Sequence, residues 1–98
     1  MGPQEEVPME LVTRHARARM QQRGIRAEVL EALLDYGREV HAGGGCDLVF
    51  FDKRARARLP RENAALAAQA ARVCKSYAIV GSEGSVITVG HRFRRIPR

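Results

Sequence analysis

The segment AEVLEALLDYGREVHAGGGCDLVFF, residues 27–51, changes its hydrophobic period at Gly37. Before that glycine the apolar residues recur at the spacing of one helix face, at Val29, Leu30, Leu33 and Leu34. After it, residues 38–42 and 46–51 are expected to form two strands joined by a turn of three glycines at 43–45. A helix followed at once by a hairpin predicts a domain of the α+β class.

A second helix is expected on the N-terminal side of this segment, over residues 14–23. Thr13 is suited to cap its N-terminus, and Gly24 is suited to end it. Its apolar stripe recurs every four residues, at Val12, Ala16 and Met20. Because so few residues separate this helix from the next, we expect the two to form a tight helical pair.

The C-terminal half is expected to add one helix and two strands. Residues 53–59 fit either a strand or a helix, and Pro60 is expected near the first turn of the helix that follows. That helix and the two strands are predicted over residues 60–73, 75–81 and 86–96. The elements together predict an N-terminal helical pair packed on a mostly antiparallel four-stranded sheet, with an extra helix between strands two and three.

The length of 98 residues suits a single domain spanning 1–98, with residues 1–10 as a flexible lead-in. There is no run of about 18 apolar residues, so we expect no membrane span. The acidic, proline-containing start does not match a signal peptide. Cys46 and Cys74 have no cysteine or histidine at ligand spacing, and we interpret them as free thiols of a cytoplasmic protein.

The net charge of +6 is unevenly distributed along the chain. Positive charge is concentrated in residues 11–25, 53–75 and 76–98, whereas residues 1–10 and 26–52 are acidic. If the three basic segments meet in the fold, they form one basic face able to bind nucleic acid. Fifteen of the seventeen basic residues are arginine, which suits RNA contact, although a GC-rich genome produces the same bias.

Two segments carry the residue types needed to cleave RNA without a metal ion. One face of the first helix holds His15, Arg19, Gln22 and Arg23. The last strand supplies His91, Arg92, Arg94 and Arg95. One imidazole would remove the proton of a ribose 2′-OH, a second acid would protonate the leaving 5′-oxygen, and arginine would stabilise the phosphate charge. No acidic cluster suits a metal ion, so we expect neither a metal nor a cofactor.

The expected catalytic residues are therefore His15, His91, Arg19 and Arg23. The expected RNA contacts are Arg92, Arg94, Arg95, Arg54, Arg56 and Lys75. Each also has a structural interpretation. His15 can pack or cap at the start of its helix, Arg19 and Arg23 can pair with acids, and the arginines of 54–58 can form a solvated face. A structural role for His91 is as compatible with the sequence as a catalytic one.

The run HARARMQQRGI, residues 15–25, resembles the opening of a family of small bacterial domains that have no assigned function. The pattern of that family is His-Ala-x-x-Arg-Met-x-x-Arg-Gly-Ile, and every fixed position is matched. The ending VITVGHRFRRI is similar to the family's last strand. The likeness covers both ends of the chain, residues 11–51 and 75–96. The family normally has serine or threonine where Arg26 stands, and segment 53–74 is longer than expected.

That family is regarded as a distant relative of the RelE/ParE-like and colicin-like ribonuclease toxins. The relation implies a RelE-like fold, metal-independent RNA cleavage, and active residues shared between the first helix and the sheet. Carried over to this sequence, it points to His15, Arg19, Arg23, His91 and Arg92. It also implies RNA or the ribosome as a partner, and an antitoxin protein that restrains the activity. ParE-like relatives poison gyrase instead, so the fold alone leaves the activity open.

The sequence thus leaves alternative functions. The first is a toxin-like ribonuclease in which His15 and His91 share the acid–base work. The second is a non-catalytic module that binds RNA or a protein through the same basic face. A weaker third is a structural domain that only neutralises the charge of a partner. The first requires the two imidazoles to lie within roughly 12 Å of each other, since each must reach its proton directly or through one water.

Overall fold

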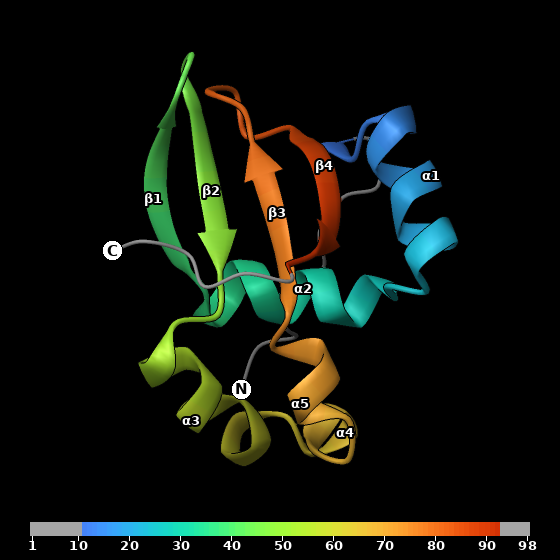
Figure 1. Cartoon of the computed structure of the whole chain (residues 1–98), viewed down its shortest axis with the longest axis vertical. Coiled ribbons are helices and arrows are strands. Elements are labelled where there is room, and N and C mark those ends of the chain that lie inside the picture. Colours follow the sequence, from blue (N-terminus) through green and yellow to red (C-terminus); the bar gives the residue numbers. More distant parts are fainter. Residues whose placement is uncertain (1–10, 93–98) are drawn as a thin grey trace, which may run out of the picture.

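A computed structural model describes residues 11–92 and contains a four-stranded antiparallel sheet in the order β1-β2-β3-β4 (Figure 1). The strands are β1 Arg38–Gly43, β2 Cys46–Phe50, β3 Ser76–Val80 and β4 Val86–His91. The predicted α+β class is confirmed, including the N-terminal helical pair on the sheet and helical structure between the second and third strands. The lead-in predicted for residues 1–10 lies outside the described residues, as do residues 93–98.

The turn between β1 and β2 is built from glycine because its backbone is left-handed. Gly43, Gly44 and Gly45 have φ values of 86°, 61° and 76°. Such values are strained for residues that carry a Cβ, whereas glycine adopts them freely. The turn sets the register of the hairpin, in which Glu39 lies opposite Val49.

Helix α1, Arg14–Arg23, lies along the outer edge of β4 (Figure 1). Thr13 ties the two together. Its Oγ1 accepts a hydrogen bond from the Ala16 amide at 3.1 Å and donates one to the Ile87 carbonyl at 3.1 Å. The Thr13 amide donates to the Val86 carbonyl at 3.0 Å. The N-terminus of α1 is therefore fixed at the start of β4.

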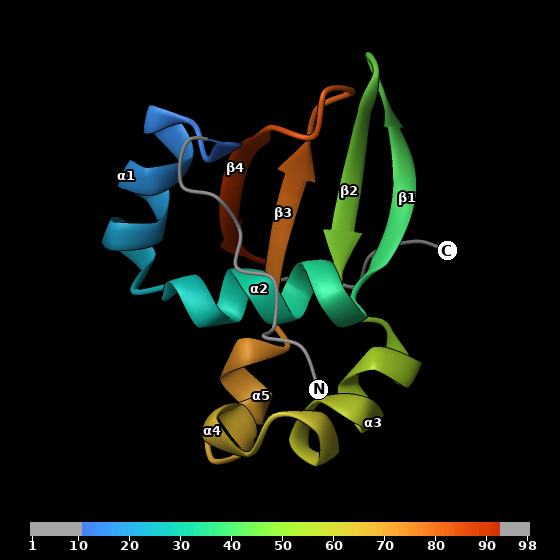
Figure 2. The same cartoon turned by 180° about the vertical axis from the view of Figure 1, so that it is seen from behind.

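Helix α2, Ala27–Tyr36, crosses the sheet face that is turned away in Figure 1 and toward the viewer in Figure 2. Leu30 and Leu33 on this helix are 1% and 0% exposed. They share one hydrophobic core with sheet residues that include Val49 and Ala78. Burying a leucine side chain stabilises a fold by about 1.5–3 kcal/mol relative to leaving it exposed. The α2 side of the sheet is thus the interior of the protein.

The segment after β2 forms three short helices, so the prediction of one helix over residues 60–73 is wrong. They are α3 Lys53–Glu62, α4 Ala64–Ala67 and α5 Ala70–Val73. Asp52 starts the first of them earlier than expected, because its carboxylate accepts a hydrogen bond from the Ala55 amide at 2.8 Å. The ambiguous arginine–alanine segment is therefore helical, and Pro60 lies inside α3. The three helices lie below α2, at one end of the sheet (Figure 2).

The last strand departs from strict alternation near its start. The two-residue period predicts Ile87 and Val89 on the same face, but Ile87 is 37% exposed and Val89 is 0% exposed. Val86 is buried instead, at 1%. The pairing of β3 with β4 shifts its register between Ile79 and Val80, and this shift accommodates the break in alternation. The strand ends at His91, short of the predicted boundary at residue 96.

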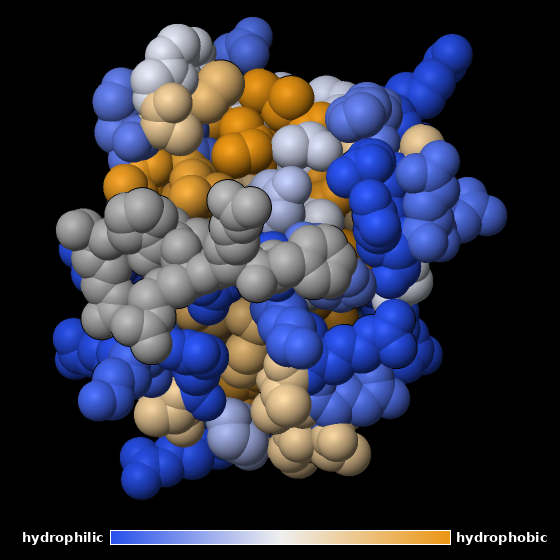
Figure 3. Space-filling model, viewed as in Figure 1, coloured by the Kyte–Doolittle hydropathy of each residue, from blue (hydrophilic) through white to orange (hydrophobic). Residues whose placement is uncertain are grey.

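The sheet face turned toward the viewer in Figure 1 is left without a helix by the described part of the chain. Figure 3 shows apolar surface over the upper part of this face. Half-buried Leu48 and Ile79 lie opposite each other in the register, so they share one face. Phe50 belongs to the same face by alternation, and Arg92 lies over its ring with 5.6 Å to the centroid.

Candidate functional site

His91 ends β4 and faces the helix side of the sheet. Its register partner in β3 is Ser76, and residues directly opposite in an antiparallel pair share a face. The pKa of His91 is lowered from its ordinary value of 6.5, mainly because burial disfavours the charged ring. Three nearby cations lower this pKa further, in the order Arg72, Arg23 and Lys75. The lowered pKa favours the neutral imidazole, which is the form that accepts a proton.

We call Arg23, Arg72, Lys75 and His91 the cationic cluster. Its members come from distant parts of the chain: the last residue of α1, helix α5, the loop before β3, and the end of β4. The antiparallel pairing of β3 with β4 brings the start of one strand to the end of the other, which places Lys75 beside His91. Each of the three basic segments of the sequence therefore contributes to one site.

Arg72 rests against the C-terminus of α1. Its Nη2 lies 3.6 Å from the position that a Cβ on Gly24 would take. Helix C-termini carry partial negative charge, which attracts a guanidinium group. The ion pairs found between described side chains involve no member of the cationic cluster. The cluster thus presents positive charge that no carboxylate in residues 11–92 neutralises by direct contact.

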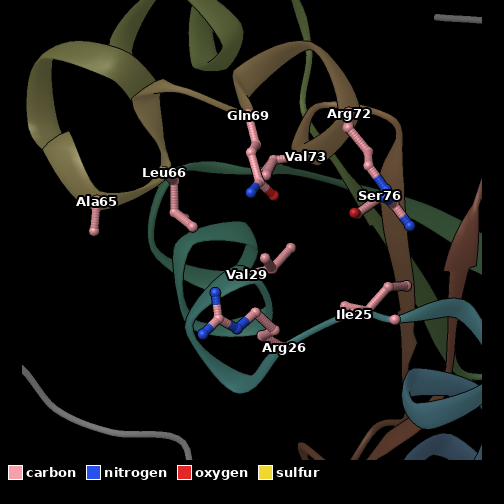
Figure 4. Close-up of a pocket in the computed structure, with 10 residues that line it drawn as sticks. Ile25, Arg26, Val29, Ala65, Leu66, Gln69, Arg72, Val73 and Ser76 are labelled. Carbon is pink, nitrogen blue, oxygen red and sulfur yellow. The ribbon is translucent and has the colours of Figure 1, made fainter.

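A pocket of about 70 Å³ lies between the α1–α2 junction, α4, α5 and the start of β3 (Figure 4). Its buried apolar wall consists of Ile25, Val29, Leu66 and Val73. Its polar side chains are Arg26, Gln69, Arg72 and Ser76. Because Arg72 lines the pocket and also acts on His91, the pocket and the cationic cluster are continuous.

Ser76 is a polar residue within the core, only 1% exposed. Its Oγ has no hydrogen-bond partner in the part of the chain that the structure describes. Figure 4 shows this hydroxyl directed into the pocket. An unpaired buried hydroxyl costs about 1–3 kcal/mol of stability. The hydroxyl is therefore an unsatisfied hydrogen-bonding group at the wall of the pocket.

The structure separates the two histidines to which sequence reasoning assigned the acid–base work. His15 lies exposed in the first turn of α1, beside the start of β4, whereas His91 ends that strand. Arg23, which acts on His91, lies about 12 Å from His15 along the helix axis at 1.5 Å per residue. His15 therefore lies at the far end of α1 from the cationic cluster.

Two other predicted arginines, Arg19 on α1 and Arg92 directly after β4, are not members of the cationic cluster. Arg19 is half-buried, and its Nε is buried without a hydrogen-bond partner among residues 11–92. Arg92 follows β4 and reaches the opposite sheet face, where it donates to the Phe51 carbonyl at 3.1 Å and stacks on Phe50. This arginine joins the end of β4 to the end of β2, a structural role.

The remaining predicted RNA contacts are spread more widely. Arg54 and Arg56 are exposed on α3. Burial raises the pKa of the Cys74 thiol, and Arg56 opposes that rise, so α3 lies close to the end of α5. Arg94 and Arg95 lie outside the described residues.

Sequence reasoning missed Arg72, Gln69 and Ser76 as site residues. The charge count identified segment 53–75 as basic, but it did not identify Arg72 as the residue of this segment that acts most strongly on His91. Ser76 begins an apolar strand and has no motif of its own. Its position opposite His91 follows from the register of β3 on β4, and a buried serine at that point is the signal that could have identified it.

No protein-family model, curated protein or solved structure matches this chain. The resemblance drawn from residues 15–25 and the RelE likeness of the fold therefore stay predictions. Within residues 11–92 no group of three or more His, Cys, Asp or Glu side chains is placed to hold a metal ion. No described helix is long and apolar enough to cross a membrane. The site offers a small pocket lined by Arg72 and the buried Ser76, and beside it a histidine on which Arg72 and two further cations act.

Proposed function

We propose that this protein is a bacterial cytoplasmic ribonuclease that binds RNA at the cationic cluster and cleaves it without a metal ion. The observation that supports this is the position of His91 at the end of β4, where Arg72, Arg23 and Lys75 act on it and favour its neutral form. The cations attract the phosphodiester and also keep the imidazole in the form that accepts a proton. A surface histidine without cations would lack the attraction for the phosphodiester, and a basic patch without a histidine would lack the proton acceptor.

In the proposed reaction, His91 removes the proton from a ribose 2′-OH. The resulting oxygen attacks the adjacent phosphorus, the bond to the 5′-oxygen breaks, and a 2′,3′-cyclic phosphate forms. Arg23 and Arg72 stabilise the negative charge that develops on the phosphate oxygens. The leaving 5′-oxygen takes its proton from Lys75, because an arginine guanidinium does not release a proton in proteins. This assignment gives Lys75 the role that the sequence predicted for a second histidine.

The partners that follow from this proposal are RNA, free or on the ribosome. The antitoxin protein implied by the family resemblance would bind over the same basic surface and restrain the activity. Charge complementarity requires such a protein to present acidic side chains to the cationic cluster.

The test is cleavage of a fluorescent RNA by purified protein in EDTA, with the product end identified. Wild type should yield 2′,3′-cyclic phosphate ends, and His91→Ala should lower the rate by about 10²–10⁴-fold, the usual worth of a general base. His41→Gln is the matched control, since His41 is exposed on β1, where it contacts Asp47 at 3.5 Å. Equal rates for wild type and His91→Ala would rule the proposal out.

The second candidate function is a module that binds RNA without cleaving it. The separation of His15 from the cluster favours it, because that separation leaves one imidazole where the sequence predicted two. It predicts RNA binding that weakens with salt, with a slope of about −0.7 in log K per phosphate contact, or about −2 for three cations. Binding with this slope, without product in EDTA or with divalent metal, would establish the module in place of the enzyme.

A further inference from the structure

The pocket beside the cationic cluster has the capacity of one small polyatomic group. Its volume is about 70 Å³. A site needs at least about 10–15 Å³ of such space for each water, so the pocket holds roughly five waters. A phosphate group has a similar number of heavy atoms. A nucleoside is several times larger and does not fit inside.

The polar groups of the pocket are all able to donate hydrogen bonds, and none of its lining residues is acidic. Arg72, Gln69 and Ser76 supply a guanidinium, an amide and a hydroxyl from α5, the residue before it, and β3 (Figure 4). Arg26, Gln69 and Arg72 are all exposed residues, but Arg26 contributes less because its side chain already pairs with Glu28 at 3.3 Å. This composition selects an anion over a cation or an apolar ligand.

The hydroxyl of Ser76 is an independent indication of a ligand. It is 1% exposed, directed into the pocket and unpartnered among the described residues. An alanine at this position would pack equally well and would avoid the cost of the unpaired group. An anionic oxygen in the pocket would accept the proton of this hydroxyl and a second hydrogen bond from Arg72.

We propose that this pocket binds the phosphoryl group of a phosphate monoester, with Arg72, Ser76 and Gln69 as its ligands. A monoester is favoured over a diester because the buried apolar wall closes the pocket on one side, so the chain of a diester could not continue through it. The apolar wall also limits water, which strengthens the hydrogen bonds to the anion. The monoester can be the terminal phosphate of an RNA or a small phosphorylated molecule. The site does not depend on RNA cleavage at the neighbouring cluster.

The first experiment is a titration of ¹⁵N-labelled full-length protein with inorganic phosphate at constant ionic strength, followed by amide chemical shifts. We expect saturable shifts centred on residues 24–26 and 69–76. Arg72→Gln and Ser76→Ala should each weaken binding by about tenfold or more, the usual value of a hydrogen bond to a charged group. Arg38→Gln is the matched control, since it removes the same charge from exposed β1 at the other edge of the sheet.

A second titration distinguishes the sources of the phosphate. It uses a 2′-O-methyl oligonucleotide, which lacks the free 2′-OH that the proposed cleavage requires, with either a 5′-phosphate, a 3′-phosphate or no terminal phosphate. Tighter binding of one phosphorylated form, lost in Arg72→Gln, identifies an RNA end as the ligand. Equal binding of all forms, with phosphate still saturating the pocket, identifies a small phosphate monoester.

The proposal is overturned if phosphate gives no saturable shifts, or if both pocket variants bind it as wild type does. Each variant is first shown to be folded by its amide spectrum, so loss of structure cannot imitate loss of the site. Because the oligonucleotide is not cleaved, failure of the ribonuclease proposal and failure of the pocket produce different results. An inactive enzyme would still bind phosphate here.

Discussion

Replacing Ser76 by alanine should stabilise the fold while it removes a ligand contact. The side chain is 1% exposed and its Oγ has no partner among the described residues. An unpaired buried hydroxyl costs about 1–3 kcal/mol of stability. Alanine keeps the Cβ and its packing. We therefore expect the free energy of unfolding to rise by about 1 kcal/mol, or the Tm by roughly 4–8 °C for a domain of this size.

Urea unfolding followed by circular dichroism, in buffer without phosphate, measures the change through the midpoint at constant slope. Ser82→Ala is the control, because Ser82 is exposed in a turn and its change should stay within about 0.5 kcal/mol. The reasoning is refuted if Ser76→Ala lowers the free energy of unfolding by about 1 kcal/mol or more. That result would mean that the hydroxyl already has a partner within the protein and is part of its structure.

Other substitutions test the fold and the electrostatics. Leu33→Ala removes a 0% exposed core side chain and should cost about 2–5 kcal/mol in the same urea assay. Asp52→Ala removes the cap of α3 and should cost about 1 kcal/mol, whereas Asp35→Ala, exposed on α2, should change little. In an NMR titration His91 should show a pKa below 6.5, and Arg23→Gln should raise it. Folded His91 binds its proton more weakly than the unfolded chain does. The free energy of unfolding should therefore fall as the pH drops from about 6.5 through the pKa of folded His91. In His91→Gln the part of this fall that comes from His91 should be absent.

Helix α1 could be predicted from the sequence because local groups fix its ends. Thr13 caps α1 through its own side chain, and Gly24 ends the helix with a φ of 66°. The glycine turn after β1 is equally local, since three consecutive glycines leave few alternatives. The order of the four strands also follows, because short connections and one helical crossover favour neighbours in the chain as neighbours in the sheet.

The region after β2 was predicted less well because two local signals compete there. Proline favours the first turn of a helix, so Pro60 suggested a helix that begins at residue 60. Asp52 is an earlier and stronger start, since its carboxylate satisfies a free amide of the first turn. The alternation of arginine and alanine that resembled a strand is the exposed and buried pattern of a helix, in which Ala55 and Leu59 are buried four residues apart.

The site depends on contacts between distant segments, which the sequence does not display. His91 and Arg23 were predicted because they lie in arginine-rich stretches without acids, and Lys75 belongs to the most basic segment, residues 53–75. Arg72 and Ser76 were missed, because their relevance depends on how α5 is turned and on the register of β3 against β4. A shift of that register by one residue would turn Ser76 away from the pocket, so only the folded chain identifies it.

The cationic cluster and the adjoining pocket each carry an energetic cost to the fold. The occurrence of both costs side by side is the main reason to regard this region as functional. The fold brings three cations around His91 without a carboxylate contact among the described residues, although like charges repel. Beside them it buries the unpaired hydroxyl of Ser76. A glutamate beside the cations would remove the first cost, and an alanine in place of Ser76 would remove the second while keeping the Cβ in the core. A phosphate in the proposed pocket would lie against Arg72 of the cluster and would accept a hydrogen bond from the Ser76 hydroxyl, as expected where local rules of stability are broken for a ligand.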